Sequence, residues 1–361
     1  MGEARTTPPR RRPSMDDVAR VAGVSKGSVS KVIRNAYGLS PAMRARVEAA
    51  IAELGYRPSI AARAMRGSSF SIGMEIPNLD IDFFTQIMDG ATSRLATSEY
   101  QLIIAPERGG ANGTRVLESL ADRSVDGIIA IAPQVEPEWL EELARDLPIV
   151  LIGRHDHSTN YDTLTDDDEA GATLLVDHLL DLGHTRIAHL TVGNQRDRPD
   201  AMPPHSLRRM AYETTLARRG LEPFVVETGN RRDEPYRTAK DLLLTDPSIT
   251  AIFAGNDSLA IDTLRAIAEL GMTADDVSVV GYDDIRIASH PLVSLTSVTQ
   301  FGETMGEIAI DLLLERIRGG RTVAAHRQVR PELRARSSSR AVRAGGRAAS
   351  RVIERSLADR A

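Results

Sequence analysis

The sequence predicts a multidomain protein in which a small all-α head with a helix-turn-helix precedes a larger α/β body of two doubly wound lobes. Two short amphipathic segments hinged at one glycine predict the head. In the body, short apolar runs alternate with longer amphipathic stretches, which is typical of parallel α/β units. The chain has 361 residues, of which 42% are hydrophobic and 26% charged, so it is long enough to form more than one core.

Composition excludes several kinds of site. There are no cysteines, so disulfides, thiolate metal sites and cysteine nucleophiles are excluded. The first thirteen residues are rich in arginine and proline with no apolar stretch behind them, and no later run approaches the ~20 apolar residues that span a bilayer. We therefore expect a cytoplasmic, nucleoid-associated protein that makes no contact with a membrane.

The net charge of -5 conceals a strong segregation of charge. Residues 1 to 66 hold 13 Lys/Arg and 5 Asp/Glu, and residues 321 to 361 hold 11 and 3, so each end has a net charge of +8. The stretch from 67 to 320 holds 21 and 42, a net charge of -21. A basic head on an acidic body favours polyanion binding by the head alone, because phosphates would repel the body. On charge alone, a solvated basic tail explains the pattern equally well.

Residues Met15 to Ile33 predict two short helices joined by a tight turn. Gly23 permits the positive φ of the turn, Val24 fills the gap between the helices, and Ser25 caps the second helix. Helical spacing turns the apolar residues of the second helix inward and leaves small or cationic residues outward. Short donors at a helix amino terminus can reach base edges in a major groove about 12 Å wide. The inward residues are Val29, Val32 and Ile33, and the outward residues are Lys26, Gly27, Ser28 and Lys31.

A third helix is predicted from Pro41, with Ser40 as its cap, to the stop at Gly55. Its apolar stripe would close a small core with the first two helices. Any small helical bundle could have these caps and stripes, but the charge and the turn favour a DNA-binding domain.

The run from Asp17 to Ser30, Asp-Val-Ala-Arg-Val-Ala-Gly-Val-Ser-Lys-Gly-Ser-Val-Ser, resembles the head of the lactose-repressor (LacI/GalR) family. The likeness continues through Glu53 to Pro58 and, more loosely, to about Ser338. The resemblance implies a transcriptional repressor that binds double-stranded operator DNA as a homodimer, and a twofold protein implies a pseudo-palindromic operator. It also implies a periplasmic-binding-protein-like body that binds a small-molecule effector, expected to be a carbohydrate.

A hinge helix over residues 59 to 66 is a further implication of the resemblance. About eight residues make too short a helix to be stable alone in water, so we expect it to fold only on DNA. Met65 stands where the family usually has the leucine that wedges into a central base step, and Lys31 stands where arginine is common. The residues expected at the DNA are Asp17, Ser25, Lys26, Gly27, Ser28, Ser30, Lys31, Arg34, Tyr56, Arg57, Ser59, Ala62 and Met65.

Two groups of four candidate strands meet near Tyr161 and predict the two lobes. Such sheets bind ligands at the carboxyl ends of their strands, so we expect the site in the cleft between the lobes. The resemblance implies that the chain crosses between lobes again around Pro291 and near Thr322. The candidate strands are Ile72 to Ile76, Leu102 to Ala105, Gly127 to Ile131, Ile149 to Ile152, Ile187 to Thr191, Phe224 to Glu227, Ala251 to Ala254 and Val277 to Gly281.

We expect five parts along the chain. They are a disordered basic amino terminus (1–13), the helix-turn-helix domain (14–58), the hinge helix and linker (59–68), the effector-binding and dimerisation core (69–338) and a disordered basic tail (339–361). Within the core, lobe 1 is expected over about 69–162 and 292–322, and lobe 2 over about 163–291 and 323–338.

Candidate effector groups follow from the resemblance, one position at a time. Two aromatic residues would wall the cleft, and an arginine, an amide and two carboxylates would pair with hydroxyl groups. The amide and the carboxylates could instead cap the helices that follow them. The six residues are Phe83, Phe84, Arg208, Asn256, Asp257 and Asp283.

No cofactor or metal is expected. The run His155-Asp156-His157 lacks a third ligand at metal-binding spacing and is interpreted as a polar loop. Asp166 to Glu169 precede an apolar helix, whose amino terminus favours negative charge.

An α/β enzyme and a transport-type sugar-binding protein, neither with a role on DNA, are the alternative functions. The chain has no glycine-rich phosphate loop, no Gly-x-Ser-x-Gly turn and no His-Glu-x-x-His, so we do not expect an enzyme. A transport protein would need a signal peptide, which the head lacks.

Overall fold

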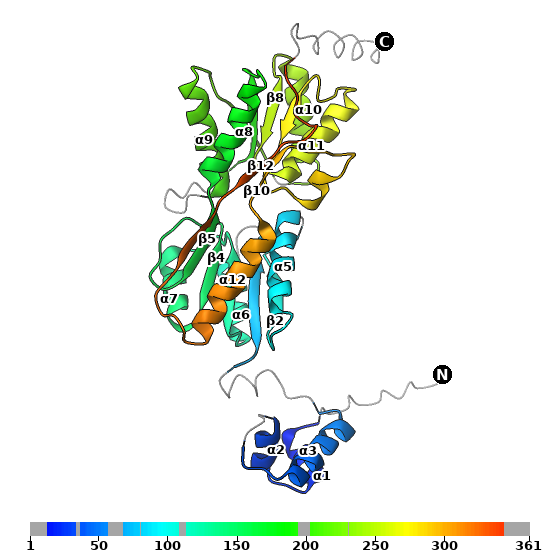
Figure 1. The fold of residues 1–361 in the computed structure, drawn as a ribbon, viewed down its shortest axis with the longest axis vertical. Coiled ribbons are helices and arrows are strands. Elements are labelled where there is room, and N and C mark those ends of the chain that lie inside the picture. The colour runs from blue at the N-terminus through cyan, green and yellow to red at the C-terminus, as the bar shows by residue number, and fades with distance from the viewer. Residues whose placement is uncertain are drawn as a thin grey trace, which may run out of the picture. The chain divides into compact units, whose positions relative to one another are not determined.

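The computed structural model describes residues 13–33, 37–56, 68–79, 81–107, 113–193, 203–229 and 231–342. The chain forms two compact units, the head (Met1–Ser69) and the body (Phe70–Ala361), which appear in blue and in cyan to red in Figure 1. Among the helices of these described ranges, none combines the length and the apolar composition needed to cross a bilayer.

The head is a three-helix domain of α1 (Met15–Ala22), α2 (Lys26–Ile33) and α3 (Pro41–Leu54). Both predicted caps are confirmed, because Ser25 Oγ accepts from Ser28 N at 3.1 Å and Ser40 Oγ accepts from Met43 N at 3.3 Å. Gly23, at φ 62°, has the positive φ that the turn needs. The apolar faces of the helices form one core, built from Val18, Ala19, Ala22, Val29, Val32, Val47, Ala50 and Tyr56.

Lobe 1 of the body is a parallel six-stranded sheet with the order β11-β5-β4-β3-β1-β2. Helices α5 and α12 cover one face, and α6 and α7 cover the other. The strands are β1 (Ser71–Ile76), β2 (Gln101–Pro106), β3 (Gly127–Ile131), β4 (Ile149–Ile152), β5 (Asp162–Asp166) and β11 (His326–Val329). The helices are α5 (Asp82–Leu95), α6 (Gly113–Asp122), α7 (Pro137–Asp146) and α12 (Gly302–Ile317).

Lobe 2 is a parallel four-stranded sheet with the order β7-β6-β8-β9. Helices α8 and α9 cover one face and α10 and α11 the other (Figure 1). A short antiparallel pair, β10 (Ser297–Thr299) with β12 (Glu332–Arg334), and a 3-10 turn, η1 (Arg286–Ser289), complete it. The other elements are β6 (Ile187–Val192), β7 (Phe224–Thr228), β8 (Ala251–Ala254), β9 (Ser278–Val280), α8 (Asp168–Asp181), α9 (Pro204–Arg218), α10 (Glu234–Thr245) and α11 (Asp257–Glu269).

The chain crosses between the lobes later than expected at all three places. Strand β5 pairs with β4, and β11 pairs with β5, so residues 162–166 and 326–329 belong to lobe 1. The first crossing therefore follows Asp166, and the third follows Val329. The second lies between Thr299, which ends β10, and Gly302, which begins α12. Strands β5, β10, β11 and β12 were missed because their sequences, DTLTD, SVT, HRQV and ELR, contain no apolar run.

The beginning of the predicted tail is a further correction. Residues 339–342 pack on lobe 2, where Ser339 is 9% exposed and its Oγ lies 2.7 Å from Thr296 Oγ1. Val342 donates its backbone N–H to Leu182 O at 2.9 Å. The rest of the expected tail, 343–361, lies outside the described residues. So do 1–12 of the expected amino terminus, 34–36 and 57–58 of the expected helix-turn-helix domain, and 59–67 of the expected hinge and linker.

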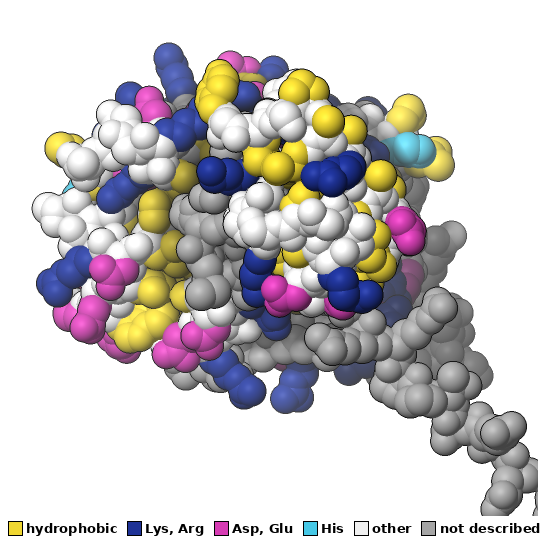
Figure 2. Space-filling view, turned by 90° about the horizontal axis from the view of Figure 1, so that it is seen from below, with side chains coloured by type: hydrophobic (Ala, Val, Ile, Leu, Met, Phe, Trp, Pro, Cys, Tyr) yellow, Lys and Arg dark blue, Asp and Glu magenta, His cyan; other side chains and the backbone are white. Residues whose placement is uncertain are grey.

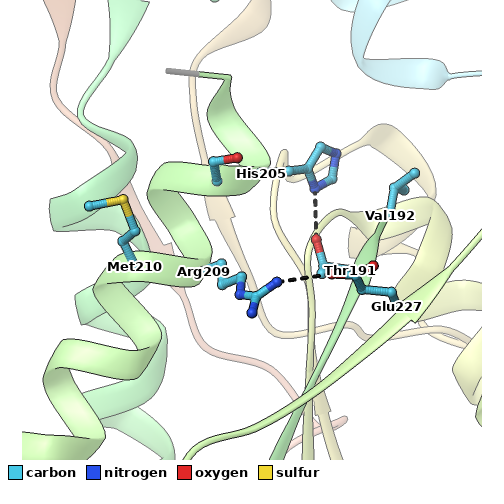
Figure 3. A pocket seen from close by; sticks show the side chains of 7 residues that line it. Thr191, Val192, His205, Arg209, Met210 and Glu227 are labelled. Atoms are coloured by element: carbon cyan, nitrogen blue, oxygen red, sulfur yellow. Dashed lines mark hydrogen bonds and ion pairs between the residues drawn. The ribbon is translucent and has the colours of Figure 1, made fainter. Parts of the chain in front are cut away.

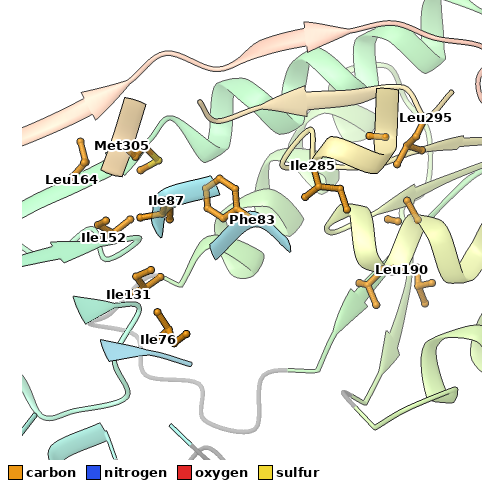
Figure 4. Packing of buried hydrophobic residues seen from close by; sticks show 14 of the residues in the cluster. Ile76, Phe83, Ile87, Ile131, Ile152, Leu164, Leu190, Ile285, Leu295 and Met305 are labelled. Atoms are coloured by element: carbon orange, nitrogen blue, oxygen red, sulfur yellow. The ribbon is translucent and has the colours of Figure 1, made fainter. Parts of the chain in front are cut away.

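The hydrophobic core of lobe 1 continues into lobe 2. In Figure 4, Phe83 of α5 lies between lobe 1 side chains, such as Ile87, and Ile285 of lobe 2. Helices α5 and α12 pack closely because Gly90 has no side chain, since a Cβ there would lie 1.9 Å from Glu303 O. This packing holds the α5 amino terminus beside lobe 2, where Gln86 Nε2 donates to Asp284 O at 3.0 Å.

Candidate functional sites in the head and the body

Helix α2 presents the outward face that its sequence predicts. Val29 is fully buried and Val32 is 6% exposed, whereas Lys26, Gly27 and Lys31 are exposed. Ser28 and Ser30 are half-buried beside them. The face therefore carries cations and small groups that leave room for close approach to a duplex. On the face of the molecule drawn in Figure 2, Lys and Arg side chains lie singly between polar and hydrophobic surface.

Ion pairs within the head neutralise part of the positive charge that could bind phosphates. Lys26 Nζ lies 2.9 Å from Asp16 Oδ2, and both side chains are exposed. The described residues of the head contain five Lys/Arg and four Asp/Glu, so most of its +8 charge belongs to residues outside the described ranges. Exposed pairs of this kind are weak, so a phosphate can displace the carboxylate from the lysine.

Two residues expected at the DNA have structural partners. Asp17 forms a capping box with Ser14, whose backbone N–H it accepts at 2.8 Å, and it pairs with Arg20 at 3.3 Å. Tyr56 is 8% exposed and packs into the head core, and its expected contact with DNA stays a prediction. Five other expected contacts lie outside the described residues: Arg34, Arg57, Ser59, Ala62 and Met65.

In the body, Arg208 of α9 is the centre of a buried cluster of polar groups. Its Nε donates to Asp168 Oδ1 at 2.7 Å and its Nη1 donates to Gly255 O at 2.9 Å. Asp283 Oδ1 lies 3.8 Å from the same Nη1, and Gln300 Nε2 donates to that carboxylate oxygen at 2.5 Å. The cluster thus joins α8, α9, the strand ends after β8 and β9, and the second crossing.

Burial and mutual repulsion change the ionisation of the carboxyl groups in this cluster. Burial, with Asp168 nearby, raises the pKa of Asp166 to about 7. Burial also raises the pKa of Asp283 to about 7, although Arg208 opposes the shift. At Asp168, burial favours the neutral form, but Arg208 and His155 outweigh it and lower the pKa. Asp168 is therefore the carboxylate that balances Arg208.

Asn256 and Asp257 have the capping and packing roles that the sequence left open. Asn256 caps α11, with its Oδ1 accepting from Leu259 N at 2.9 Å. Asp257 is fully buried and accepts from Ile285 N at 2.9 Å and from Ser297 Oγ at 2.7 Å. Both follow β8 next to Gly255, so they hold the strand end that binds Arg208.

Phe83 and Phe84 do not share the environment of Arg208. Phe83 is 7% exposed and belongs to the core between the lobes, and Phe84 packs half-buried against the same core. The two rings are 6.3 Å apart, centre to centre. Their place on α5 fits a wall of the interlobe region more than a contact with the polar cluster.

The sequence did not predict several members of the cluster. Asp166 and Asp168 belong to a noted acidic run, but only Asp167 acts as the helix cap, accepting from Ala170 N at 3.0 Å. His155 lies 2.9 Å from Asp168, and Tyr282 donates its hydroxyl to Asp166 at 2.6 Å. Within the described residues, no three His, Cys, Asp or Glu side chains form a group that could hold a metal ion.

A cavity of about 360 Å³ lies next to this cluster on lobe 2 (Figure 3). His205 on its wall is close to Gly255, whose carbonyl binds Arg208, because a Cβ on Gly255 would lie 2.9 Å from His205 Nδ1. Burial and Arg208 lower the pKa of His205 to about 4, so the ring is neutral. A volume of this size suits a small ligand. The lining residues are Thr191, Val192, His205, Ser206, Arg209, Met210 and Glu227.

Two family models match the chain. The model of bacterial regulatory proteins of the lacI family matches residues 14–59, and that of a periplasmic binding protein-like domain matches residues 176–339. Among curated proteins, the chain is similar to the ribose operon repressor of Escherichia coli (strain K12). The two are 33% identical over 335 residues, which cover 90% of this chain and 99% of that repressor.

The chain is also similar to solved structures of lacI-family regulators. The chain is similar to the lac repressor dimer bound to operator and the anti-inducer ONPF, with a TM-score of 0.75, 26% identity, and coverage of 92% of this chain and 100% of that one. It is also similar to a LacI family transcriptional regulator from Enterococcus faecium with bound ribose, with a TM-score of 0.67, 25% identity, and coverage of 76% and 100%.

Proposed function

This chain belongs to the lacI family of bacterial regulatory proteins, and from that membership we propose that it is a transcriptional repressor whose head binds operator DNA and whose body binds a small-molecule effector. The observation that carries the DNA-binding role is the exposed face of α2, with Lys26, Gly27 and Lys31 beside the Ser25 cap. In this proposal α2 enters the major groove, where Lys31 reaches a base edge or a phosphate.

The protein acts as a homodimer on a pseudo-palindromic operator, in the manner of the lac repressor dimer that is bound to operator. The hinge over residues 59 to 66, with Met65 as its wedge, lies outside the described residues and remains part of the proposal. Effector binding would change the orientation of one lobe relative to the other. This change would decide whether residues 59 to 66 are ordered or disordered.

The effector binds beside Arg208 and Asp283, next to the cavity on lobe 2. A guanidinium and a carboxylate 3.8 Å apart offer both donors and acceptors, which a hydroxyl-rich ligand needs. The Enterococcus faecium regulator was solved with ribose, which supports a sugar as the class of ligand. The carboxylates around Arg208 disfavour a ligand with a negative charge.

Selection of genomic fragments by the purified full chain, followed by footprinting, tests the DNA-binding role. We expect two protected half-sites about ten base pairs apart, related by twofold symmetry. Fragments without twofold symmetry would contradict the dimer, and no protected fragment would contradict the function. A thermal-shift screen of the chain against sugars tests the effector, since a ligand of the folded state raises the Tm and Asp283→Ala should abolish that rise.

The matched relatives are regulators, and we infer that the body binds its ligand without transforming it and that the protein works in the cytoplasm, where the operator is. Incubating the chain with each sugar that raises its Tm, and analysing the sugar by NMR, tests this. Unchanged sugar is expected, and catalytic conversion would contradict the inference.

A further inference from the structure

The carboxylate of Asp168 binds one residue of each lobe. Its Oδ1 accepts from Arg208 Nε at 2.7 Å, and its Oδ2 lies 2.9 Å from His155 Nε2. Arg208 is on α9 of lobe 2, whereas His155 is in the loop between β4 and β5 of lobe 1. The side chain of Asp168 is completely buried, so neither contact competes freely with water. One buried carboxylate therefore links the lobes just after the first crossing.

The lobe 1 end of this link is firmly held. Arg154 donates Nη1 to Pro133 O and to Val135 O at 3.3 and 3.2 Å, and its Nη2 binds Asp156 at 2.6 Å. Tyr161 donates its hydroxyl to the same Asp156 at 2.6 Å. These bonds fix the residues on both sides of His155 to the lobe 1 core, so His155 cannot follow Asp168 without moving the loop.

At its lobe 2 end, this link depends on the side chain of Arg208. The guanidinium carbon of Arg208 lies over the Tyr282 ring, 3.6 Å from its centre, and the guanidinium donates to Gly255 O. The Nη1 group that donates to Gly255 O also lies 3.8 Å from Asp283 Oδ1, where the effector is proposed to bind. A ligand that recruits these groups acts on the same guanidinium that Asp168 holds.

We propose that Asp168 is a positioning residue that couples the effector site to lobe 1, holding Arg208 for the ligand and transmitting its displacement to the β4–β5 loop through His155. The coupling rests on the proposed effector site at Arg208. A shift of Arg208 either breaks its bond to Asp168 or pulls Asp168 against His155, and both alternatives change the lobe 1 contact.

Hydrogen exchange of the backbone amides of residues 153–161 in the full chain, without effector or operator, tests the link. Arg208→Gln should raise exchange in this loop by about tenfold, although Arg208 sits on the other lobe. In an Asp168→Leu background, Arg208→Gln should add nothing, because the link is already broken. Asp168→Asn, which keeps one acceptor and one donor, should restore most of the protection lost in Asp168→Leu. The matched control is Arg209→Gln, on the same helix, which should leave the loop unchanged.

Unchanged loop exchange in Arg208→Gln, or an equal increase in the Asp168→Leu background, would overturn the coupling. Should the Arg208 variant fail to fold, His155→Ala provides the reverse measurement, because His155 is 18% exposed and its loss is milder. The His155→Ala substitution should shift the NMR resonance of the Arg208 Nε–H group, and an unchanged resonance would overturn the proposal. Since no sugar is used, a failure here is separate from a failure of the effector screen.

Discussion

The guanidinium carbon of Arg208 lies over the Tyr282 ring, 3.6 Å from its centre, while the Tyr282 hydroxyl donates to Asp166 at 2.6 Å. The face of the Tyr282 ring therefore contacts Arg208, and its hydroxyl holds Asp166, the last residue before the first crossing. This arrangement is possible because position 171 is a glycine, where a Cβ would lie 2.1 Å from the Tyr282 hydroxyl oxygen.

Gly171→Ala is expected to lower the Tm of the body and weaken effector binding. Tyr282 is fully buried and has no space to retreat, so the added methyl should cost about 1–3 kcal/mol of unfolding free energy. Urea unfolding and the sugar thermal-shift response measure the two effects. Glu169→Ala, at a nearby exposed position, is the control and should change neither. Normal stability and ligand response in Gly171→Ala would show that Tyr282 does not position Arg208.

Arg208→Gln should destabilise the body much more than Arg209→Gln. Arg208 is 4% exposed and faces two buried carboxylates, so its removal leaves uncompensated charge and should cost roughly 3–5 kcal/mol. Arg209 pairs with Glu213 and Glu227 at an exposed position, where the loss should be about 1 kcal/mol or less. Urea unfolding of both variants checks the difference, and equal losses would contradict the central role of the buried pair.

Glu75 should make the stability of lobe 1 depend on pH. It is fully buried on β1, and among the described residues no side chain donates a hydrogen bond to its carboxylate. Burial, and then Glu107, raises its pKa from 4.5 to about 8, so the folded protein holds the proton more tightly than the unfolded chain. The stability contribution is therefore complete below pH 4.5 and is lost as the pH rises through 8, by about 1.4 kcal/mol per pH unit.

Glu75→Gln should remove this part of the pH dependence, leave the parts that Asp166 and Asp283 contribute below about pH 7, and stabilise the protein above pH 8. Urea unfolding at several pH values measures the change. Glu118→Gln, on the exposed face of α6, should keep the wild-type slope. If Glu75→Gln unfolds with the same pH dependence as the wild type, the carboxyl of Glu75 is not the group responsible.

Lys31→Ala should relax operator preference at one base position. Lys31 is exposed on α2, where a base contact is worth roughly 1–3 kcal/mol of discrimination. Binding to single-base operator variants measures this effect. Uniform weakening across all variants would instead assign Lys31 to a phosphate. Glu48→Gln, exposed on α3, is the control and should leave base preference unchanged.

The sequence predicted most regular elements because their patterns are local. All eight candidate strands agree with the structure to within one residue at each end, since buried parallel strands have short apolar runs. The crossing strands were missed because polar segments such as Asp162–Asp166 are buried only through tertiary pairing, in this case with β4 and with the distant β11. Local sequence patterns do not indicate such pairing.

The polar cluster was only partly predictable, for the same reason. Arg208 and Asp283 were found through resemblance, but Asp168 looked like an ordinary charge at a helix start. Its role depends on Arg208, 40 positions away in sequence, and on His155 in the other lobe. The packing of Tyr56 in the head core was not predicted either, because the resemblance indicated only a contact with DNA.

The salt dependence of DNA binding tests the central claim most directly. Fluorescence anisotropy of the full chain with fragments flanking its own gene should show affinity falling by about 10³-fold or more between about 50 and 200 mM salt, because bound lysines and arginines release counterions. Replacing both Lys26 and Lys31 by alanine should weaken binding and flatten the slope. An affinity that is absent for every genomic fragment, or insensitive to salt, would contradict the assignment of the head to duplex DNA.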